Sequence, residues 1–213
     1  MATEPLSRAR IIAAAIDLIE REGADAVSMR RIAAELGFGV MSLYNHVPNK
    51  DALLNGVAET VLSEIEFTDD PDAHWTDRVR MQARAFRQIA HGHPRSTMLV
   101  VSRQLRSTAG LLPVERALAT LRSAGFDGVH AVRVLRMFIA FIVGSLLREV
   151  GVTPTFAPDH RHTVEEVDAT LFPEVSALSS LLRSCDHEAE YEFGVELLIQ
   201  AIAVHPQRRE GTR

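Results

Sequence analysis

Helical periodicity of apolar positions dominates the chain. The first apolar stripe has the i, i+3, i+4, i+7 spacing of one helix face and consists of Ile12, Ala15, Ile16 and Ile19. Ser7 before this stripe and Gly23 after it are typical of helix ends, because serine accepts a free backbone amide and glycine tolerates the final turn. No segment shows the strict apolar–polar alternation that indicates strands. The sequence therefore predicts an all-α protein.

The same periodicity predicts further helices, separated by glycine, proline and polar turns. They are expected over residues 28–36, 40–47, 50–65, 75–91, 96–107, 111–124, 127–150, 163–184 and 188–204. The acidic, proline-containing segment 67–74 is the one plausible domain boundary. We therefore expect an N-terminal domain over residues 1–66 and a larger domain over residues 67–213.

Charge is distributed unevenly along the chain. The 213 residues are 46% apolar, enough for a sizeable core, and carry a net charge of −5. Residues 1–50 hold six cationic and six acidic side chains, so the whole net charge comes from the remainder. A negative surface argues against non-specific nucleic-acid binding by the entire molecule. Any anion-binding surface is therefore expected at the N-terminal end.

Neither a disulfide nor a membrane-spanning segment is expected. Cys185 is the only cysteine, which excludes an internal disulfide and a zinc–thiolate cluster. The strongest apolar run, residues 137–147, is too short to cross a bilayer, and the N-terminus lacks an apolar stretch of signal-peptide length. These features favour a cytoplasmic protein.

Two short predicted helices, 28–36 and 40–47, are joined by Gly-Phe-Gly and form a helix-turn-helix. In that motif the second helix enters the major groove and its early residues meet base edges. Gly39 begins the second helix without a side-chain acceptor, and Leu43 anchors it to the core. The outward positions are Met41, Ser42, Tyr44, Asn45 and His46. This pattern favours DNA binding over an ordinary pair of surface helices.

Residues 7–65 resemble the DNA-binding domain of the tetracycline-repressor (TetR) family of bacterial transcription regulators. The segments RIIAAAIDLIEREG, SMRRIAAELG and LYNHVPNKDAL carry the likeness. Beyond the expected boundary, HWTDRVRMQARAFRQIAHGHP, LATLRSAGFD and YEFGVELLIQAI resemble the C-terminal domain of the tetracycline-repressor-like branch. The resemblance implies a helical ligand-binding and dimerisation domain behind the helix-turn-helix.

The resemblance also implies a set of DNA-contacting residues, namely Ser28, Arg30, Val40, Met41, Ser42, Tyr44, Asn45, His46 and Lys50. Arg30 would read a base, because a guanidinium can pair bidentately with guanine. Residues 40–42 would read bases at the start of the recognition helix. Tyr44, His46 and Lys50 would contact phosphates, and Lys50 would add its charge to the positive end of the following helix.

A homodimer, a palindromic duplex operator and a small-molecule inducer are further implications of the resemblance. Helices 127–150 and 188–204 would form an intersubunit four-helix bundle, in which Gly144 and Gly194 permit close approach. A mostly apolar inducer pocket would be lined by Trp75, Phe86, His91, Met98, Arg103, His130, Phe138 and Phe141. Val101 stands where tetracycline-binding relatives have a metal-binding histidine, so tetracycline itself is not expected.

The favoured function is a ligand-responsive repressor whose DNA-binding heads move apart when the inducer binds. Three alternatives stay open. In the first, the two apolar helices form the core of a monomer. In the second, the regulator has no small-molecule ligand. In the third, the chain is an all-α metal-dependent enzyme. Possible metal ligands are His160, His162, Glu165 and Glu166, although a solvated polar loop is favoured. No nucleophile elbow, phosphate-binding glycine loop or HExxH motif is present, and no cofactor or resident metal is expected.

Overall fold

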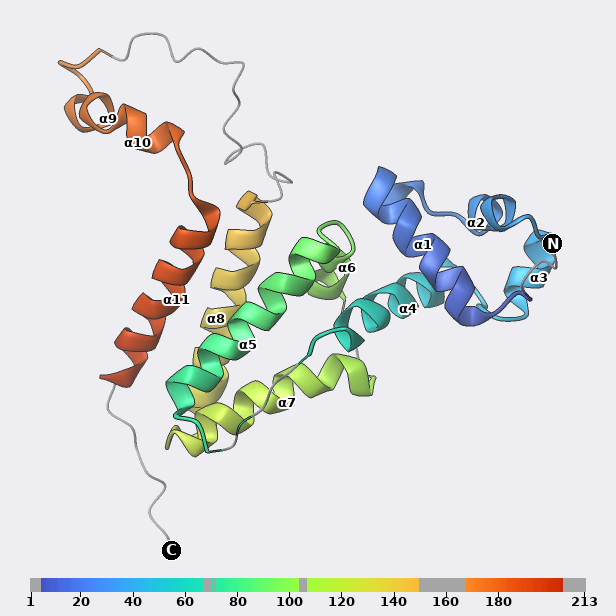
Figure 1. Cartoon of the computed structure of the whole chain (residues 1–213), viewed down its shortest axis with the longest axis horizontal. Coiled ribbons are helices and arrows are strands. Elements are labelled where there is room, and N and C mark those ends of the chain that lie inside the picture. The colour runs from blue at the N-terminus through green and yellow to red at the C-terminus, as the bar shows by residue number, and fades with distance from the viewer. Residues whose placement is uncertain (1–4, 67–69, 71, 104–106, 150–167, 205–213) are drawn as a thin grey trace, which may run out of the picture. The chain divides into compact units, whose positions relative to one another are not determined.

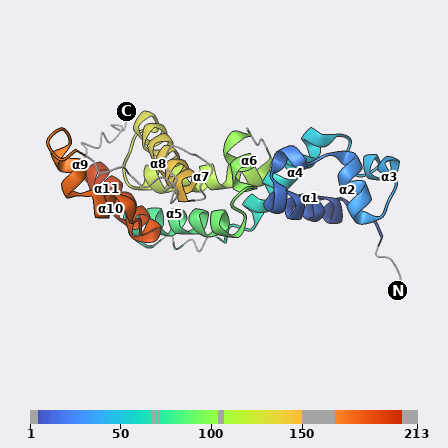
Figure 2. The same cartoon turned by 90° about the horizontal axis from the view of Figure 1, so that it is seen from above.

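The computed structural model describes residues 5–66, 70, 72–103, 107–149 and 168–204 (Figures 1 and 2). Within these residues all regular structure is helical, so the prediction of an all-α fold is confirmed. The elements in chain order are α1 (Arg8–Glu22), η1 (Ala24–Ala26), α2 (Met29–Leu36), α3 (Val40–Tyr44), α4 (Lys50–Ser63), α5 (Trp75–Gly92), α6 (Thr97–Ser102), α7 (Thr108–Ser123), α8 (Gly128–Glu149), α9 (Pro173–Ala177), α10 (Ser179–Arg183) and α11 (His187–Ala203).

Local capping explains where the N-terminal helices begin. The hydroxyl of Ser7 accepts the Arg10 amide at 3.2 Å, and that of Ser28 accepts the Arg31 amide at 3.2 Å. The side chain of Asn49 accepts the amide of Ala52 at 2.7 Å. Each cap satisfies an amide that has no partner inside its helix. The helix starts expected from the sequence are therefore confirmed.

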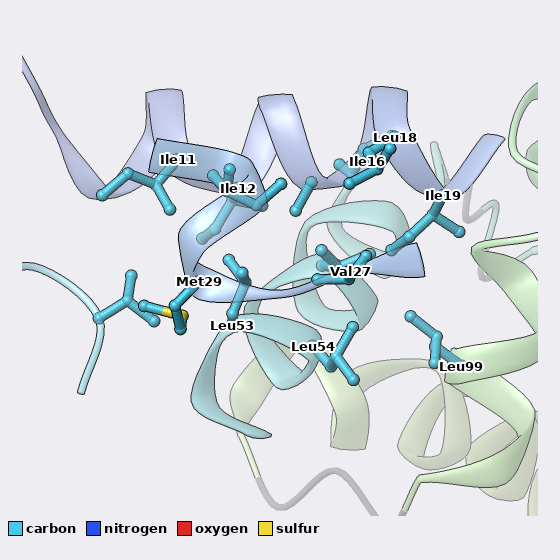
Figure 3. Close-up of a cluster of buried hydrophobic side chains, with 14 of the residues drawn as sticks. Ile11, Ile12, Ile16, Leu18, Ile19, Val27, Met29, Leu53, Leu54 and Leu99 are labelled. Carbon is cyan, nitrogen blue, oxygen red and sulfur yellow. The ribbon is translucent and has the colours of Figure 1, made fainter. Parts of the chain in front are cut away.

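The helices α1–α4 enclose a continuous apolar core (Figure 3). Ile11 and Ile19 of α1 lie above Leu53 and Leu54 of α4 in this view, and Leu99 from α6 reaches the same cluster. Gly56 of α4 permits this close packing, since a Cβ there would lie 2.8 Å from the Cδ1 atom of Ile12. From α3, Leu43 belongs to this core and Val40 packs against it.

The described residues divide into two compact units at Ala131 and Val132. In the first unit α5 packs against α7, and Gln82 donates a hydrogen bond of 2.9 Å to the buried Thr120 hydroxyl. In the second unit α8 packs against α11, with the Phe141 and Tyr191 ring centroids 5.8 Å apart. Arg148 of α8 also forms an ion pair with Glu190 of α11.

Close approach at Gly194, expected between subunits, occurs within one chain. A Cβ at Gly194 would lie 2.2 Å from the Cζ atom of Phe141 in α8. A Cβ at Gly144 would have no described atom within 4 Å, so that position is open within the chain. The tight packing of α8 against α11 therefore depends on Gly194.

The prediction of one helix over residues 163–184 is wrong in its described part. Residues 168–172 form a turn, in which the Asp168 carboxylate accepts the Thr170 amide at 2.8 Å. Pro173 then begins α9, as expected for a residue that lacks an amide hydrogen. Helices α3, α4 and α6 are also shorter than expected, ending at Tyr44, Ser63 and Ser102, and α7 begins at Thr108 instead of residue 111.

Candidate nucleic-acid interface

Helix α3 is held to the N-terminal core by Leu43 and Val40 and exposes Met41 and Tyr44. Leu43 is 0% exposed, whereas Met41 is 73% and Tyr44 43% exposed. Ser42 is half-buried, and the half-buried Val40 packs against the core cluster. A methionine and a tyrosine left in water on so short a helix provide apolar and hydrogen-bonding groups for a partner.

The Gly-Phe-Gly turn fixes the direction in which α3 leaves α2. Gly37 adopts the left-handed conformation with φ of 74°, and the amide of Phe38 returns to the carbonyl of Ala33 at 2.9 Å. The guanidinium of Arg10 lies 5.5 Å from the centre of the Phe38 ring, a cation–π contact between α1 and the turn. Gly39 gives α3 no side-chain cap, as the sequence predicts. The turn is therefore ordered by the core and by α1.

A second exposed group follows α3. Asn45 and His46 are exposed, whereas Val47 between them and α4 is buried and fixes the chain. Lys50 is the first residue of α4 and is also exposed. A lysine beside free helix amides is a suitable phosphate-binding group.

The two adjacent arginines of α2 have different surroundings. Arg31 forms an ion pair with Glu22, and its Nε lies 3.9 Å from a carboxylate oxygen of Glu35. Arg30 is exposed and has no ion pair within the described part of the chain. Arg30 is therefore available to an external anion or base edge, whereas Arg31 is bound by carboxylates of α1–α4, the helices that we call the head.

The expected inducer-contacting residues are spread over several local environments. The Trp75 ring meets Phe126 edge-on at 6.0 Å, Phe86 and Met98 are half-buried, and His91 is exposed. In the second unit Phe138 is buried and Phe141 packs on Tyr191. A common pocket formed by these residues stays a prediction.

Two of the expected inducer-contacting residues have clear partners within the chain. The amide and the ring Nδ1 of His130 each lie 2.8 Å from the Asp127 carboxylate, and these hydrogen bonds hold the pKa of Asp127 below its ordinary value. Arg103 Nη1 donates to Asp51 at 2.8 Å and to Asn55 at 2.5 Å, so it contacts α4. The contact between Arg103 and α4 could not be predicted from the sequence, because no local pattern links residues about fifty positions apart.

The possible metal ligands of the polar segment, His160, His162, Glu165 and Glu166, lie outside the described residues. Among the residues that are described, no group of three or more His, Cys, Asp or Glu side chains is placed to hold a metal ion. Cys185 is exposed, and desolvation together with a hydrogen bond to Glu190 raises the pKa of its thiol. A raised pKa disfavours the reactive thiolate form.

Comparison with known proteins agrees with this geometry. Residues 11–57 match the family of bacterial regulatory proteins named tetR, and residues 67–205 match the tetracyclin repressor-like C-terminal domain. The tetracycline repressor protein class A from transposon 1721 of Escherichia coli is 32% identical and covers 91% of this chain and 88% of its own. The transcriptional repressor DrrR1 of Streptomyces coeruleorubidus is 27% identical over 95% of this chain and 79% of its own.

Solved structures show the same fold. Apo ActR from Streptomyces coelicolor superposes with a TM-score of 0.80 at 30% identity, covering 95% of this chain and 97% of its own. ActR in complex with actinorhodin gives the same TM-score and identity, covering 95% of this chain and 100% of its own. The chain therefore belongs to the tetR family of bacterial regulatory proteins, and it is a DNA-binding transcriptional regulator with a C-terminal domain of the tetracycline-repressor type.

Proposed function

We propose that this regulator is a homodimeric, cytoplasmic repressor that leaves a palindromic operator when a small molecule binds its C-terminal domain. The observation that supports this proposal best is the exposure of Met41 and Tyr44 on a helix anchored by the fully buried Leu43. Such a helix satisfies the two needs of groove recognition, a rigid attachment and an accessible reading face.

The proposed contacts separate into two classes. Arg30, Met41 and Ser42, with Val40 as a partly buried neighbour, read base edges. Lys50 supplies a charge to the DNA backbone. The remaining backbone contacts come from Ser28, Tyr44, Asn45 and His46. The first class sets sequence preference, and the second sets affinity and its dependence on salt.

The proposal of a homodimer is supported by exposed apolar side chains on α8 and α11. Ile139 of α8 and Phe193 and Leu197 of α11 are exposed in the single chain. The run 137–147 was expected to be too short to cross a bilayer, but the whole of α8, with 22 residues, is long and apolar enough to do so by length and composition alone. A second copy that covers these side chains explains their exposure and places two recognition helices on one duplex.

The ligand is proposed to be small and largely apolar. The half-buried Trp75, Phe86 and Met98 lie on α5 and α6, the helices expected to border the pocket. ActR was solved with actinorhodin and with (S)-DNPA. By linkage, the factor by which such a ligand weakens DNA binding equals the factor by which DNA weakens ligand binding.

The test begins with selection of duplexes from a random pool by the purified protein. The selected operator should be an inverted repeat, and sedimentation of the complex should give two protomers per duplex. A duplex with one half-site should bind far more weakly. A selected site without internal symmetry, or one protomer per operator, would reject the proposal.

A further inference from the structure

Helix α6 lies beyond the expected domain boundary but packs on the DNA-binding helices. Leu99 is 8% exposed and belongs to the apolar core of α1 and α4 (Figure 3). Val100 packs against the same core, and α6 and α4 are neighbours in both views (Figures 1 and 2). The six-residue helix α6 therefore packs against the core formed by α1–α4.

The turn that precedes α6 is bound by a side chain from α1. One carboxylate oxygen of Glu20 accepts the amide of Ser96 at 2.8 Å, and the other accepts the amide of Arg95 at 3.1 Å. The Arg95 guanidinium returns a hydrogen bond of 2.7 Å to the Arg21 carbonyl. These three hydrogen bonds, which we call the Glu20 clasp, join the end of α1 to the start of α6.

The clasp satisfies two amides of the turn that precedes α6. The first amides of α6 itself bond to nearby carbonyls, that of Thr97 to His93 at 2.9 Å and that of Met98 to Arg95 at 3.3 Å. Ser96 precedes α6, but its backbone is helical and its side chain caps no amide of the helix. Its hydroxyl is buried and has no hydrogen-bond partner in the described residues. Ser96 is buried, and a buried amide without a partner is costly, so the Glu20 carboxylate, 76 residues away, stabilises this turn by accepting the Ser96 amide.

The C-terminal end of α6 is fixed to α4. The Arg103 guanidinium donates to Asp51 and Asn55, one and five residues after Lys50. The clasped turn directly follows α5, which ends at Gly92, so these contacts join α1 and α4 to the end of α5. Rotation of α1–α4 against α5 therefore breaks charge-assisted hydrogen bonds at one end of α6.

We infer that Glu20 is a positioning residue for operator recognition, which holds each recognition helix in the orientation that one half-site spacing requires. This inference rests on the proposed dimeric binding to an inverted repeat. Glu20 touches no DNA and acts through α6. Loss of the clasp lets each head turn and accept other spacings, without altering the groups that contact a single half-site.

The test measures spacing preference directly. Dissociation constants are compared for the selected operator, for the same operator with its half-sites one base pair closer or farther apart, and for a single half-site. Glu20→Gln is isosteric and weakens the Glu20 clasp, since an amide group can accept only at its oxygen. Glu59→Gln is the control, because Glu59 lies on α4, pairs with Arg8 at 3.8 Å, and its replacement removes the same charge.

Wild-type protein and Glu59→Gln should both prefer the selected spacing. For Glu20→Gln we expect that preference to shrink about tenfold, the effect of losing one charge-assisted hydrogen bond, while single half-site affinity stays within about twofold. Unchanged spacing preference overturns the inference, as does an equal loss of affinity for every duplex. Arg95→Met, which removes the reciprocal bond, should reproduce the effect and serves if Glu20→Gln does not fold. Absence of any spacing preference in the wild type would instead reject the proposed dimeric function.

Discussion

Replacing Lys50 with glutamine should stabilise the free protein while it weakens DNA binding. Lys50 begins α4, whose free amides give that end a partial positive charge. Within the described residues Lys50 has no ion-pair partner, and the neighbouring Asp51 is engaged by Arg103. A cation in this position is unfavourable by about 0.3–1 kcal/mol, so the variant should gain about that much free energy of unfolding.

The effect on the operator complex has the opposite sign. Each neutralised phosphate contributes about −0.9 to the slope of log affinity against log salt concentration. A homodimer carries Lys50 twice, so the variant should lose about 1.8 from the magnitude of that slope. When salt rises fourfold, from about 50 to about 200 mM, the variant should therefore lose about twelvefold less affinity than the wild type.

Fluorescence anisotropy with the selected duplex at several salt concentrations measures the slope, and urea unfolding measures the stability. Arg183→Gln is the matched control, because it removes one exposed charge from α10 in the second unit. The control should leave the slope unaltered. An unchanged slope for the Lys50 variant, or an equal change in the control, would refute the phosphate contact.

Two further changes test the packing and the pH dependence of the C-terminal helices. Gly194→Ala places a Cβ 2.2 Å from Phe141, and overpacking of about 1–3 kcal/mol should exceed the alanine helix gain of about 0.5–1 kcal/mol. The urea midpoint should fall and should partly recover when Phe141→Leu is added; an unchanged midpoint would contradict the contact. The hydrogen bonds from His130 lower the folded-state pKa of Asp127, so its stabilisation is present above its ordinary pKa and is lost as pH falls through the lowered value. Asp127→Asn should therefore flatten the loss of stability in acid, and an acid limb identical to the wild type would count against this reasoning.

The helix starts and the inward faces of the N-terminal domain were predictable because their causes are local. Ser7, Ser28 and Asn49 each cap an amide three residues later, a spacing visible in the sequence. The buried Leu43 follows from the same periodicity. The exposed face of α3 was predictable for the same reason.

Contacts between distant residues were not predictable. The sequence favoured Arg103 as an inducer contact, whereas the structure shows it on Asp51 and Asn55 of α4. Neither periodicity nor spacing distinguishes Arg30 from Arg31. Of these two arginines only Arg31 forms ion pairs within the described residues, with Glu22 and Glu35. Such assignments depend on which elements the fold brings together.

The helix expected over residues 163–184 shows a different limit. Its apolar residues recur densely enough to suggest one helix, and six of them, from Leu171 to Leu182, are exposed. Pro173 and the turn at Asp168 divide the segment, because a proline begins a helix more readily than it continues one. In this segment the helix-ending residues decide the structure more than the helical spacing of the apolar residues does.

The most direct measurement is the base preference of Arg30→Ala compared with the wild type, determined by parallel selection from one random duplex pool. Arg30 is exposed and is the second residue of α2. The wild type should select an inverted repeat with half-site centres about 34–36 Å apart, and the variant should lose preference at one symmetric position at a cost of about 1–3 kcal/mol. Identical selected sequences for both proteins, or no inverted repeat for either, would contradict recognition of DNA by this surface.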